Sequence, residues 1–492
     1  MALDQLAIDR LRAVAVAPGQ NFVDGQHCMP RSGQAMDSIS PIDGRVLTSI
    51  PASDAADVDA AVAAARRAQP GWAGLAPARR GRILQEIGAR IDAEADALAV
   101  LGVQDNGTEI AMAHKAEPLS AAATFRYYGE LADKGYGEIA PTAPGTLGLV
   151  HREPLGVIGA IVPWNFPLMI GAWKVAAALA AGNSVVLKPA ETASLTLLRL
   201  AQICAMAGLP DGVFNVVAGT GAEAGDALAR HMDVDALAFT GSGATGRKLM
   251  EAAAQSNLKR VYLELGGKSP LVVFADAPDL EAAAKTAVGA IFRNAGQVCV
   301  AASRLLVETS IHADFVARIC DLAGEMKLGD PLDLATQSGA IASETQMTSV
   351  LAAIDRGHSE GAELRLGGRR RDMPGFFIDP TVFDNAPAQS SLVQREIFGP
   401  VLAVQPFATE EAAVALANGT AYGLAAGVFT ADLARAHRMV SRLRAGVVHV
   451  NTYGGTDLTV PLGGIGQSGN GHDKSTHALD KYTNLKTAWI KL

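Results

Sequence analysis

Cysteine is scarce in this chain of 492 residues. The four cysteines are Cys28, Cys204, Cys299 and Cys320, and no two of them form a C-x-x-C pair. This spacing argues against a disulfide scaffold and against a cysteine zinc site. The ten histidines include no H-x-x-x-H pair, so we predict no metal. A reducing compartment follows as the expected location, and we take it to be the cytoplasm.

Long apolar runs and a strong charge bias are also missing. The most apolar stretch, residues 155–173, contains Pro163 and Pro167 and is closed by Lys174, whereas a membrane span needs about 20 unbroken apolar residues. The first residues alternate in charge and have no apolar core, so we expect no signal peptide. The formal net charge is -8 and no basic stripe occurs, which argues against nucleic-acid binding.

Glycine and aliphatic residues are abundant instead. The chain has 51 glycines and 49% hydrophobic residues, and its length suggests two or three domains of about 100–200 residues each. From residue 155, short apolar runs alternate with helical stretches, and a second series runs from 271 past 448. This alternation is typical of a doubly wound parallel sheet in an α/β protein. Residues 53–68 and 78–104 are predicted to be amphipathic helices.

A Pro-x-x-x-Pro loop, Pro163-Trp164-Asn165-Phe166-Pro167, directly follows the apolar strand LGVIGAIV. It could be an ordinary connecting loop. Two prolines around Trp, Asn and Phe nevertheless make a rigid construction, and it stands at the carboxyl end of a strand, where α/β proteins place their sites. The amide of Asn165 could donate an N–H there to a developing oxyanion.

Cys299 and Glu264 are candidates for chemistry. A lone cysteine is more often a small core residue, but Gly296 just upstream of Cys299 allows close backbone approach, which favours a nucleophile. Glu264 stands among apolar residues and glycines in LELGGKSP. It is either a buried acid with a raised pKa or a partly exposed turn acid.

A glycine-rich turn predicts a dinucleotide site. Gly241, Ser242 and Gly246 belong to G-S-G-A-T-G, which follows the strand ALAFT and precedes a helix whose N-terminus would favour a pyrophosphate. At the end of another strand, Lys188 and Glu191 in LKPAE could both reach ribose hydroxyls.

Together these motifs resemble the aldehyde dehydrogenase superfamily. PWNFP, LKPAE, FTGS, LELGGKSP, GQVC, EIFGP and the closing PLGG…SGNG stretch occur in the family's order and spacing, from about residue 20 to the end. The resemblance implies NAD-dependent oxidation of an aldehyde to a carboxylic acid. It also implies a dimer or tetramer of this chain, with a small-molecule aldehyde as substrate.

The resemblance implies roles residue by residue. Cys299 would be the nucleophile that forms a thioester, Glu264 the general base, and Asn165, with the backbone N–H of Cys299, the oxyanion hole. Lys188 and Glu191 would hold the adenosine ribose, and Ser242 the pyrophosphate. Glu396 would bind the nicotinamide ribose, next to Phe398. The remaining cofactor residues would be Trp164, Gly241 and Gly246. Because Glu191 would repel a 2′-phosphate, we expect NAD to be preferred over NADP.

The implied fold is α/β, with three parts. A variant Rossmann domain for NAD would comprise residues 1–131 and 153–263, and a catalytic domain residues 264–462. A small β oligomerisation arm would be built from 132–152, which is punctuated by Gly and Pro, and 478–492, which ends in a strand pattern.

The chain departs from the family in the region expected to line a substrate funnel. Leu462 stands where members often have an aromatic residue, and Ile465-Gly466 where they have Tyr-Lys. Thr476 aligns with a glutamate of some members, which argues against a second acid that relays protons. Phe166, Trp173, Asp457 and Leu462 are the predicted funnel residues.

The stretches from Ser468 and from Thr456 (TDLTVP) look most like γ-glutamyl-γ-aminobutyraldehyde dehydrogenases and other aminoaldehyde dehydrogenases. With Asp457 at the funnel, they predict an ω-amino or ω-guanidino aldehyde of polyamine or arginine breakdown. The alternatives are a broad-specificity aliphatic or aromatic aldehyde dehydrogenase, a member that passes the acyl group to coenzyme A, and a non-catalytic member.

Overall fold

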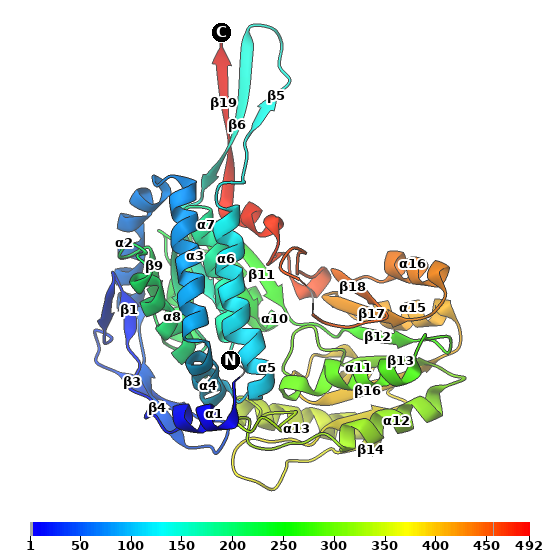
Figure 1. Ribbon diagram of the computed structural model, residues 1–492. Coiled ribbons are helices and arrows are strands. Elements are labelled where there is room, and N and C mark those ends of the chain that lie inside the picture. Colours follow the sequence, from blue (N-terminus) through cyan, green and yellow to red (C-terminus); the bar gives the residue numbers. More distant parts are fainter. Residues whose placement is uncertain (1–2, 456) are drawn as a thin grey trace.

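The computed structural model describes residues 3–455 and 457–492. It consists of two α/β lobes, each built around a seven-stranded sheet, and a long β arm that projects from the first lobe (Figure 1). The first lobe carries the amino-terminal half of the chain, and the second carries most of the rest. Within the described residues, no helix has both the length and the apolar character needed to cross a membrane.

The first sheet has the strand order β11-β10-β7-β8-β9-β1-β2. Its first five strands run parallel, which confirms the predicted parallel sheet, while β1 is antiparallel to both of its neighbours. The strands are β1 (Asn21–Val23), β2 (Gln26–Cys28), β7 (Val157–Ile161), β8 (Ser184–Lys188), β9 (Phe214–Val216), β10 (Ala236–Gly241) and β11 (Arg260–Leu265).

Helices cover both faces of this sheet. The predicted helix over 53–68 is confirmed, but the one over 78–104 is two helices, because the backbone of Glu94 leaves the helical region at φ -106°, ψ 10°. This lobe contains α1 (Gln5–Arg12), α2 (Ala55–Ala73), α3 (Pro77–Ala93), α4 (Ala95–Asn106), α5 (Ile110–His114), η1 (Lys115–Leu119), α6 (Ser120–Leu131), α7 (Pro167–Ala180), α8 (Leu195–Met206), η2 (Gly221–Gly225), α9 (Asp226–Arg230) and α10 (Gly243–Ala254), with a separate hairpin of β3 (Ala35–Ile39) and β4 (Val46–Pro51).

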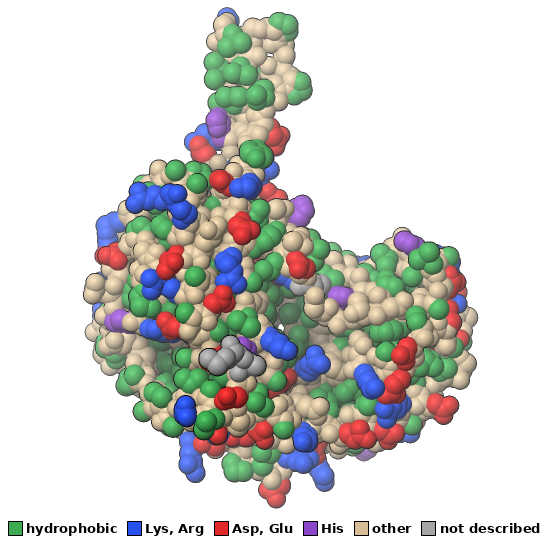
Figure 2. All heavy atoms as spheres, in the orientation of Figure 1, with side chains coloured by type: hydrophobic (Ala, Val, Ile, Leu, Met, Phe, Trp, Pro, Cys, Tyr) green, Lys and Arg blue, Asp and Glu red, His purple; other side chains and the backbone are tan. Residues whose placement is uncertain are grey.

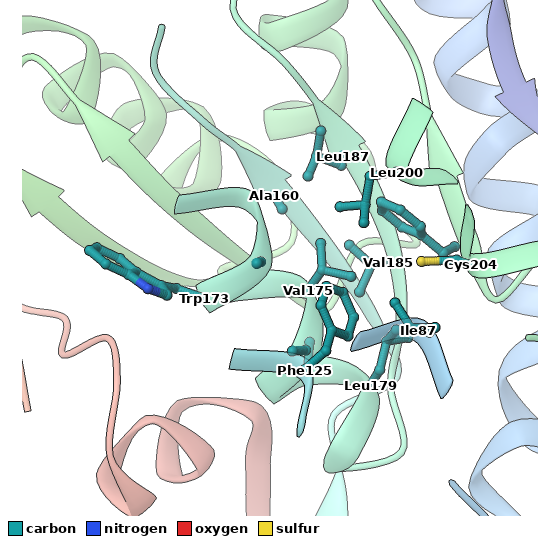
Figure 3. Packing of buried hydrophobic residues seen from close by; sticks show 14 of the residues in the cluster. Ile87, Phe125, Ala160, Trp173, Val175, Leu179, Val185, Leu187, Leu200 and Cys204 are labelled. Carbon is teal, nitrogen blue, oxygen red and sulfur yellow. The ribbon is translucent and has the colours of Figure 1, made fainter. Parts of the chain in front are cut away.

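The main core lies where α3, α6, α7 and α8 pack on the sheet. Ile87 of α3 and Phe125 of α6 lie against Val175 and Leu179 of α7, next to Val185 of β8 (Figure 3). Burial of each such side chain contributes about 1.5–3 kcal/mol to the free energy of unfolding. This packing holds α7 rigidly, and the loop that begins α7 is the PWNFP loop.

The second sheet has the order β14-β15-β16-β13-β12-β17-β18, parallel except at β14. Its strands are β12 (Pro270–Val273), β13 (Arg304–Glu308), β14 (Glu363–Leu366), β15 (Thr381–Asp384), β16 (Val401–Phe407), β17 (Ala425–Phe429) and β18 (Val447–Val450). Its helices are α11 (Leu280–Phe292), η3 (Arg293–Gly296), α12 (His312–Gly324), α13 (Glu344–Ser359), α14 (Ser391–Gln394), α15 (Glu410–Asn418) and α16 (Leu433–Arg442).

The arm is a three-stranded antiparallel sheet with the order β19-β6-β5. Its strands are β5 (Glu138–Ala140), β6 (Thr146–Pro154) and β19 (Thr483–Lys491). The first part of the arm therefore extends two residues past the predicted end at 152. The arm's second part begins at Thr483 rather than at 478, because η5 (Thr476–Tyr482) buries Ala478 and Tyr482 in the core of the first lobe.

The division between the lobes also differs from the predicted boundary at residue 264. Glu264 lies in β11 of the first sheet, which ends only at Leu265. After β18 the chain returns to the first lobe, with η4 (Gly466–Ser468) close to β11 and the backbone of Gly469 bridged to Glu264. The closing segment of the sequence thus forms part of the wall around Glu264.

Candidate active site

The PWNFP loop connects β7 to α7, which starts at Pro167. Asn165 is buried, and its side-chain Nδ2 donates a hydrogen bond of 2.9 Å to the backbone carbonyl of Gln297. Its Oδ1 has no hydrogen-bond partner among the described residues. The predicted rigid placement of one amide at a strand end is therefore present, and this amide is tied to the loop that carries Cys299.

The loop from Asn294 to Cys299 is strained at its start. Asn294 and Ala295 have φ values of 51° and 49°, in the left-handed region that disfavours non-glycine residues. Gly296 follows with φ 73°, and a Cβ there would lie 2.1 Å from the carbonyl oxygen of Gly399. Only glycine can pass so close to that backbone, so this position fixes the path of the chain into Cys299.

A cavity of about 280 Å³ lies between the two lobes. The first lobe contributes residues from the ends of β7, β10 and β11, and the second contributes Cys299 and the segment around Glu396. The structure therefore brings together seven of the predicted site residues: Trp164, Asn165, Gly241, Ser242, Cys299, Glu396 and Phe398. Gln346 and Ser349 of α13 also line the cavity, and no motif in the sequence indicated them.

The surroundings of Cys299 disfavour its thiolate form. Burial, together with the negative charges of Glu396 and Glu264, raises the pKa of Cys299 to about 12. Because the thiolate is the nucleophilic form, a cysteine in this environment reacts only after a positive charge or a base has lowered that pKa.

Glu264 is a buried acid, which is the first of the two alternatives that the sequence left open. Burial, and next the negative charge of Asp473, raise the pKa of Glu264 well above its ordinary value. A Cβ at Gly471 would lie 3.2 Å from Glu264 Oε1, so the carboxyl group packs on the backbone of the returning segment. Oε1 has no hydrogen-bond partner among the described residues, and Glu264 is not among the residues that line the cavity of Cys299.

A second acid, Asp473, acts electrostatically on Glu264, whereas the expectation from Thr476 that no second acid relays protons stays a prediction. Asp473 is fully buried and forms an ion pair of 3.0 Å with Lys174 and a second ion pair with Lys481. These two lysines hold the pKa of Asp473 down at about 2, against the opposing effect of burial. No local motif in the sequence indicates Asp473, which stands three residues before Thr476.

The glycine-rich turn has the geometry of an anion site. Ser242 is the N-cap of α10 and its side chain accepts the backbone N–H of Thr245. Ser242 and Gly241 line the cavity, so the N-terminal end of this helix dipole is directed toward it. Gly246 plays a different part, since a Cβ there would lie 3.0 Å from Leu265 of β11, and glycine lets the helix pack closely on the strand.

Two further carboxylates are candidates for cofactor binding, one after β8 and one at the cavity. At the end of β8, Lys188 forms a 3.0 Å ion pair with Glu191, whose side chain is 46% exposed. At the cavity, Glu396 accepts the N–H of Gly267, and a Cβ at Gly266 would lie 1.8 Å from its Oε2. Burial raises the pKa of Glu396 to about 7. Both carboxylates can accept hydrogen bonds from hydroxyl groups.

Two aromatic rings share the cavity with Glu396. Phe398, held at φ 57°, packs edge-to-face on Trp164 with ring centroids 5.2 Å apart. Both rings line the cavity, so a flat aromatic ligand would meet an apolar surface there.

The predicted funnel residues are more dispersed. Trp173 is buried in α7, and Lys474 lies over its ring with Nζ 5.7 Å from the centroid. Leu462 is half-buried against the same core, and Asp457 is exposed. Phe166 is buried in the core of the first lobe and is absent from the residues that line the cavity. Thr456, which begins the TDLTVP stretch, lies outside the described residues.

The sequence profile of the Aldehyde dehydrogenase family matches residues 28–488. The chain belongs to the aldehyde dehydrogenase family. Among curated relatives, this aldehyde dehydrogenase is 47% identical to "NADP/NAD-dependent aldehyde dehydrogenase PuuC" of Escherichia coli K12, over 96% of its own length and 95% of the relative's.

Two solved structures resemble this aldehyde dehydrogenase over their whole length. One is an indole-3-acetaldehyde dehydrogenase complexed with NAD+, with 48% identity, a TM-score of 0.98 and full coverage of both chains. The other is a γ-glutamyl-γ-aminobutyraldehyde dehydrogenase from Burkholderia cenocepacia J2315, with 47% identity, a TM-score of 0.97 and full coverage of both chains.

The residues of this aldehyde dehydrogenase fit a dinucleotide. A pyrophosphate suits the N-terminus of α10, and ribose hydroxyls suit the carboxylates of Glu396 and Glu191. A nicotinamide ring suits the surface of Phe398 and Trp164 beside Cys299.

Proposed function

We propose that this aldehyde dehydrogenase oxidises an aldehyde to a carboxylic acid, with NAD as acceptor, through a thioester on Cys299. The observation that carries the proposal is that Cys299, the amide of Asn165 and the carboxylate of Glu396 line one cavity. A nucleophile, an oxyanion donor and a cofactor anchor are thereby within reach of one small ligand.

Asn165 and the backbone N–H of Cys299 would stabilise the oxyanion that forms when sulfur attacks the aldehyde carbon. Loss of one such donor typically costs about 3–4 kcal/mol of transition-state stabilisation. The raised pKa of Cys299 disfavours the thiolate in the absence of ligands. NAD supplies a hydride acceptor, and its positive nicotinamide ring favours the thiolate.

Glu264 would take a proton from the water that hydrolyses the thioester. Its raised pKa makes the carboxylate a strong base once it is ionised, and Lys174 and Lys481 favour that ionised form. Asp473 opposes the ionisation of Glu264. When Glu264 is ionised, the two carboxylates and the two lysines carry two negative and two positive charges. We take Glu264 to be the base that separates hydrolysis from transfer to another acceptor.

The substrate we propose is an ω-amino or ω-guanidino aldehyde, and specifically one of the γ-glutamyl-γ-aminobutyraldehyde type. The backbone N–H of Thr459 donates a hydrogen bond to Asp457 and lowers the pKa of its carboxyl group. The ammonium of Lys474 lies over the Trp173 ring and interacts electrostatically with the carboxylate of Asp457. Such a pair suits a substrate whose far end carries both an ammonium and a carboxylate.

The main alternative substrate is an apolar aromatic aldehyde. The similar indole-3-acetaldehyde dehydrogenase favours it, as does Leu462, which is smaller than an aromatic residue. An acyl transfer to coenzyme A is disfavoured by the buried acid at Glu264, and a non-catalytic protein by the convergence of Cys299 and Asn165 on one cavity.

The test measures NADH formed by the purified chain from NAD and a panel of aldehydes, with and without coenzyme A. The panel contains 4-aminobutyraldehyde, its γ-glutamyl derivative, butyraldehyde and indole-3-acetaldehyde. We expect NADH without coenzyme A and the highest kcat/KM for the γ-glutamyl aldehyde. Formation of NADH only when coenzyme A is present, or with none of the aldehydes, would overturn the proposal.

The arm supports a dimer or tetramer of this chain. Its edge strands β5 and β19 offer unpaired backbone groups, and hydrophobic side chains gather along it in Figure 2. The exposed large apolar residues there are Tyr136, Ile139, Leu485, Trp489, Ile490 and Leu492. We expect Trp489→Asp to reduce the sedimentation mass, and an unchanged mass would count against this role.

The four free cysteines favour the cytoplasm as the location of this protein.

A further inference from the structure

A buried turn between α4 and α5, residues 106–109, touches both loops of the candidate active site. α4 ends at Asn106, whose Oδ1 accepts the N–H of Thr108 at 3.0 Å, and Gly107 turns the chain with φ 79°. A Cβ at Gly107 would lie 2.9 Å from Ala340 Cβ. Thr108 and Glu109 are both at most 3% exposed, so this turn is fixed by packing and is shielded from water.

The turn holds the strained start of the cysteine loop from two sides. The hydroxyl of Thr108 donates a 2.8 Å hydrogen bond to Asn294 Oδ1. The carboxylate of Glu109 accepts the backbone N–H of Asn294, at 3.1 Å from each oxygen. These contacts stabilise Asn294 in the left-handed conformation that starts the path to Cys299.

The Thr108 hydroxyl also decides which way the Asn294 amide faces. Because Oδ1 is occupied by Thr108, Nδ2 of Asn294 is directed toward the carbonyl oxygens of Gln297, at 3.3 Å, and Asn165, at 3.4 Å. The Gln297 carbonyl is the same atom that accepts Asn165 Nδ2 at 2.9 Å. A chain of hydrogen bonds thus runs from Thr108 through Asn294 and Gln297 to the amide of Asn165.

This chain sets the direction of one particular N–H bond. An asparagine amide has two N–H donors in one plane. One donor of Asn165 is committed to Gln297, and the plane of the amide then fixes where the second one is directed. Asn165 lines the cavity of Cys299, so the second donor is the one available to an oxygen bound there.

We propose that Thr108 is a positioning residue for the oxyanion, acting through Asn294 and the Gln297 carbonyl on the amide of Asn165. This inference rests on the proposed function, because it assumes that Asn165 stabilises the oxyanion. Without the Thr108 hydroxyl, the buried Oδ1 of Asn294 loses its donor, and a rotated amide would set that oxygen against the Gln297 carbonyl. The two oxygens would repel each other and displace the acceptor of Asn165.

The alternative is that Thr108 only satisfies a buried amide and thereby stabilises the fold. The two roles differ in a double-mutant cycle, because a residue that acts through Asn165 loses its effect once the Asn165 amide is removed. Thr108→Val replaces the hydroxyl with a methyl group at nearly the same volume, and Thr108→Ser keeps the hydroxyl. They form a matched pair at one buried position.

The experiment uses the full chain, varies NAD and the aldehyde in turn while the other is saturating, and measures kcat, both KM values and Tm for five proteins. These are the wild type, Thr108→Val, Thr108→Ser, Asn165→Ala and the double variant Thr108→Val/Asn165→Ala. We expect Thr108→Val to lower kcat about tenfold with the KM for NAD unchanged, and Thr108→Ser to stay within about twofold of the wild type. Asn165→Ala should lower kcat about 10²–10³-fold, as loss of an oxyanion donor does. The double variant should be no slower than Asn165→Ala.

Two results would overturn the inference: full activity in Thr108→Val, or an equal loss from Thr108→Val with and without the Asn165 amide. If Thr108→Val does not fold, Thr108→Ala takes its place in the same cycle. Failure of the proposed function gives a different pattern, since the wild type would then oxidise no aldehyde, or Asn165→Ala would be fully active.

Discussion

Lys174 Nζ lies 3.0 Å from Asp473 Oδ2, and both side chains are only 1% exposed. Lys481 pairs with the other oxygen of the same carboxylate. A buried ammonium without a carboxylate would be costly, so Asp473 is needed wherever Lys174 and Lys481 are both charged. The same ion cluster acts on Glu264, because Asp473 raises the pKa of Glu264 while the two lysines lower it.

Asp473→Asn should destabilise the fold strongly. It leaves two like charges buried side by side, and removal of one partner of a buried ion pair costs about 3–5 kcal/mol. Chemical denaturation of this variant measures the loss in the free energy of unfolding. Asp480→Asn is the control, because Asp480 belongs to the same segment but pairs on the surface with Arg152. Equal stability of the two variants would contradict the account.

The stabilisation from Asp473 should also depend on pH. Its folded pKa of about 2 lies below the ordinary value of 3.8, so the contribution is complete above about pH 4 and disappears as the pH falls through 2. The difference in unfolding free energy between the wild type and Asp473→Asn should therefore shrink over that window. A difference that stays constant from pH 6 to pH 2 would contradict a lowered pKa of Asp473 in the folded protein.

The role of Asp473 could not be predicted from the sequence. Asn165 and Cys299 could be found because their signals are local: a loop between two prolines, and a cysteine after a glycine. The partner of Lys174 stands 299 residues away in a segment without periodicity, so no local pattern identifies it. One signal was available, because a lysine inside the most apolar helix of the chain requires a buried carboxylate.

The fold was predictable to a similar degree. Parallel strands follow from short apolar runs, and both sheets were recognised from them. The break at Glu94 and the packing of Ala478 and Tyr482 were not, because tertiary contacts decide both. The turn at Thr108 had no sequence signal either, since its role comes from Asn294 on the other lobe.

Glu264→Gln should slow hydrolysis of the thioester more than its formation. The amide cannot accept a proton from water, whereas Cys299 and Asn165 are unchanged. Stopped-flow measurement should show a burst of NADH equal to the enzyme present, followed by a steady state at least about 100-fold slower, as expected for loss of a general base. Equal loss of the burst and of the steady state would assign Glu264 a different role.

Glu191→Ser should improve the use of NADP. The charge of Glu191 opposes a 2′-phosphate, and Lys188, 3.0 Å away, would be released to bind that phosphate. Because the carboxylate is partly exposed, we expect a gain of about 1 kcal/mol, or about fivefold in kcat/KM for NADP. The value for NAD in the same variant is the internal control. An unchanged ratio of NADP to NAD would place the cofactor's ribose elsewhere.

Lys474→Met and Asp457→Asn should change substrate preference in different ways. Lys474→Met removes the cation suited to a substrate carboxylate and should lower kcat/KM for the γ-glutamyl aldehyde more than for 4-aminobutyraldehyde. Asp457→Asn should weaken both relative to butyraldehyde. Burial lowers the pKa of Lys474 to about 8, so the wild type should lose its preference for the γ-glutamyl aldehyde as the pH rises through 8. Identical preferences in all three proteins would leave a general aldehyde dehydrogenase.

Covalent catalysis by Cys299 is the central claim, and NADH formation by Cys299→Ala tests it most directly. The control is Cys320→Ala, because Cys320 belongs to α12 of the same lobe and does not line the cavity. We predict that Cys299→Ala forms no NADH from an aldehyde that the wild type oxidises but still binds NAD in a calorimetric titration. We predict that Cys320→Ala keeps the wild-type rate. Activity of Cys299→Ala within tenfold of the wild type would contradict the account.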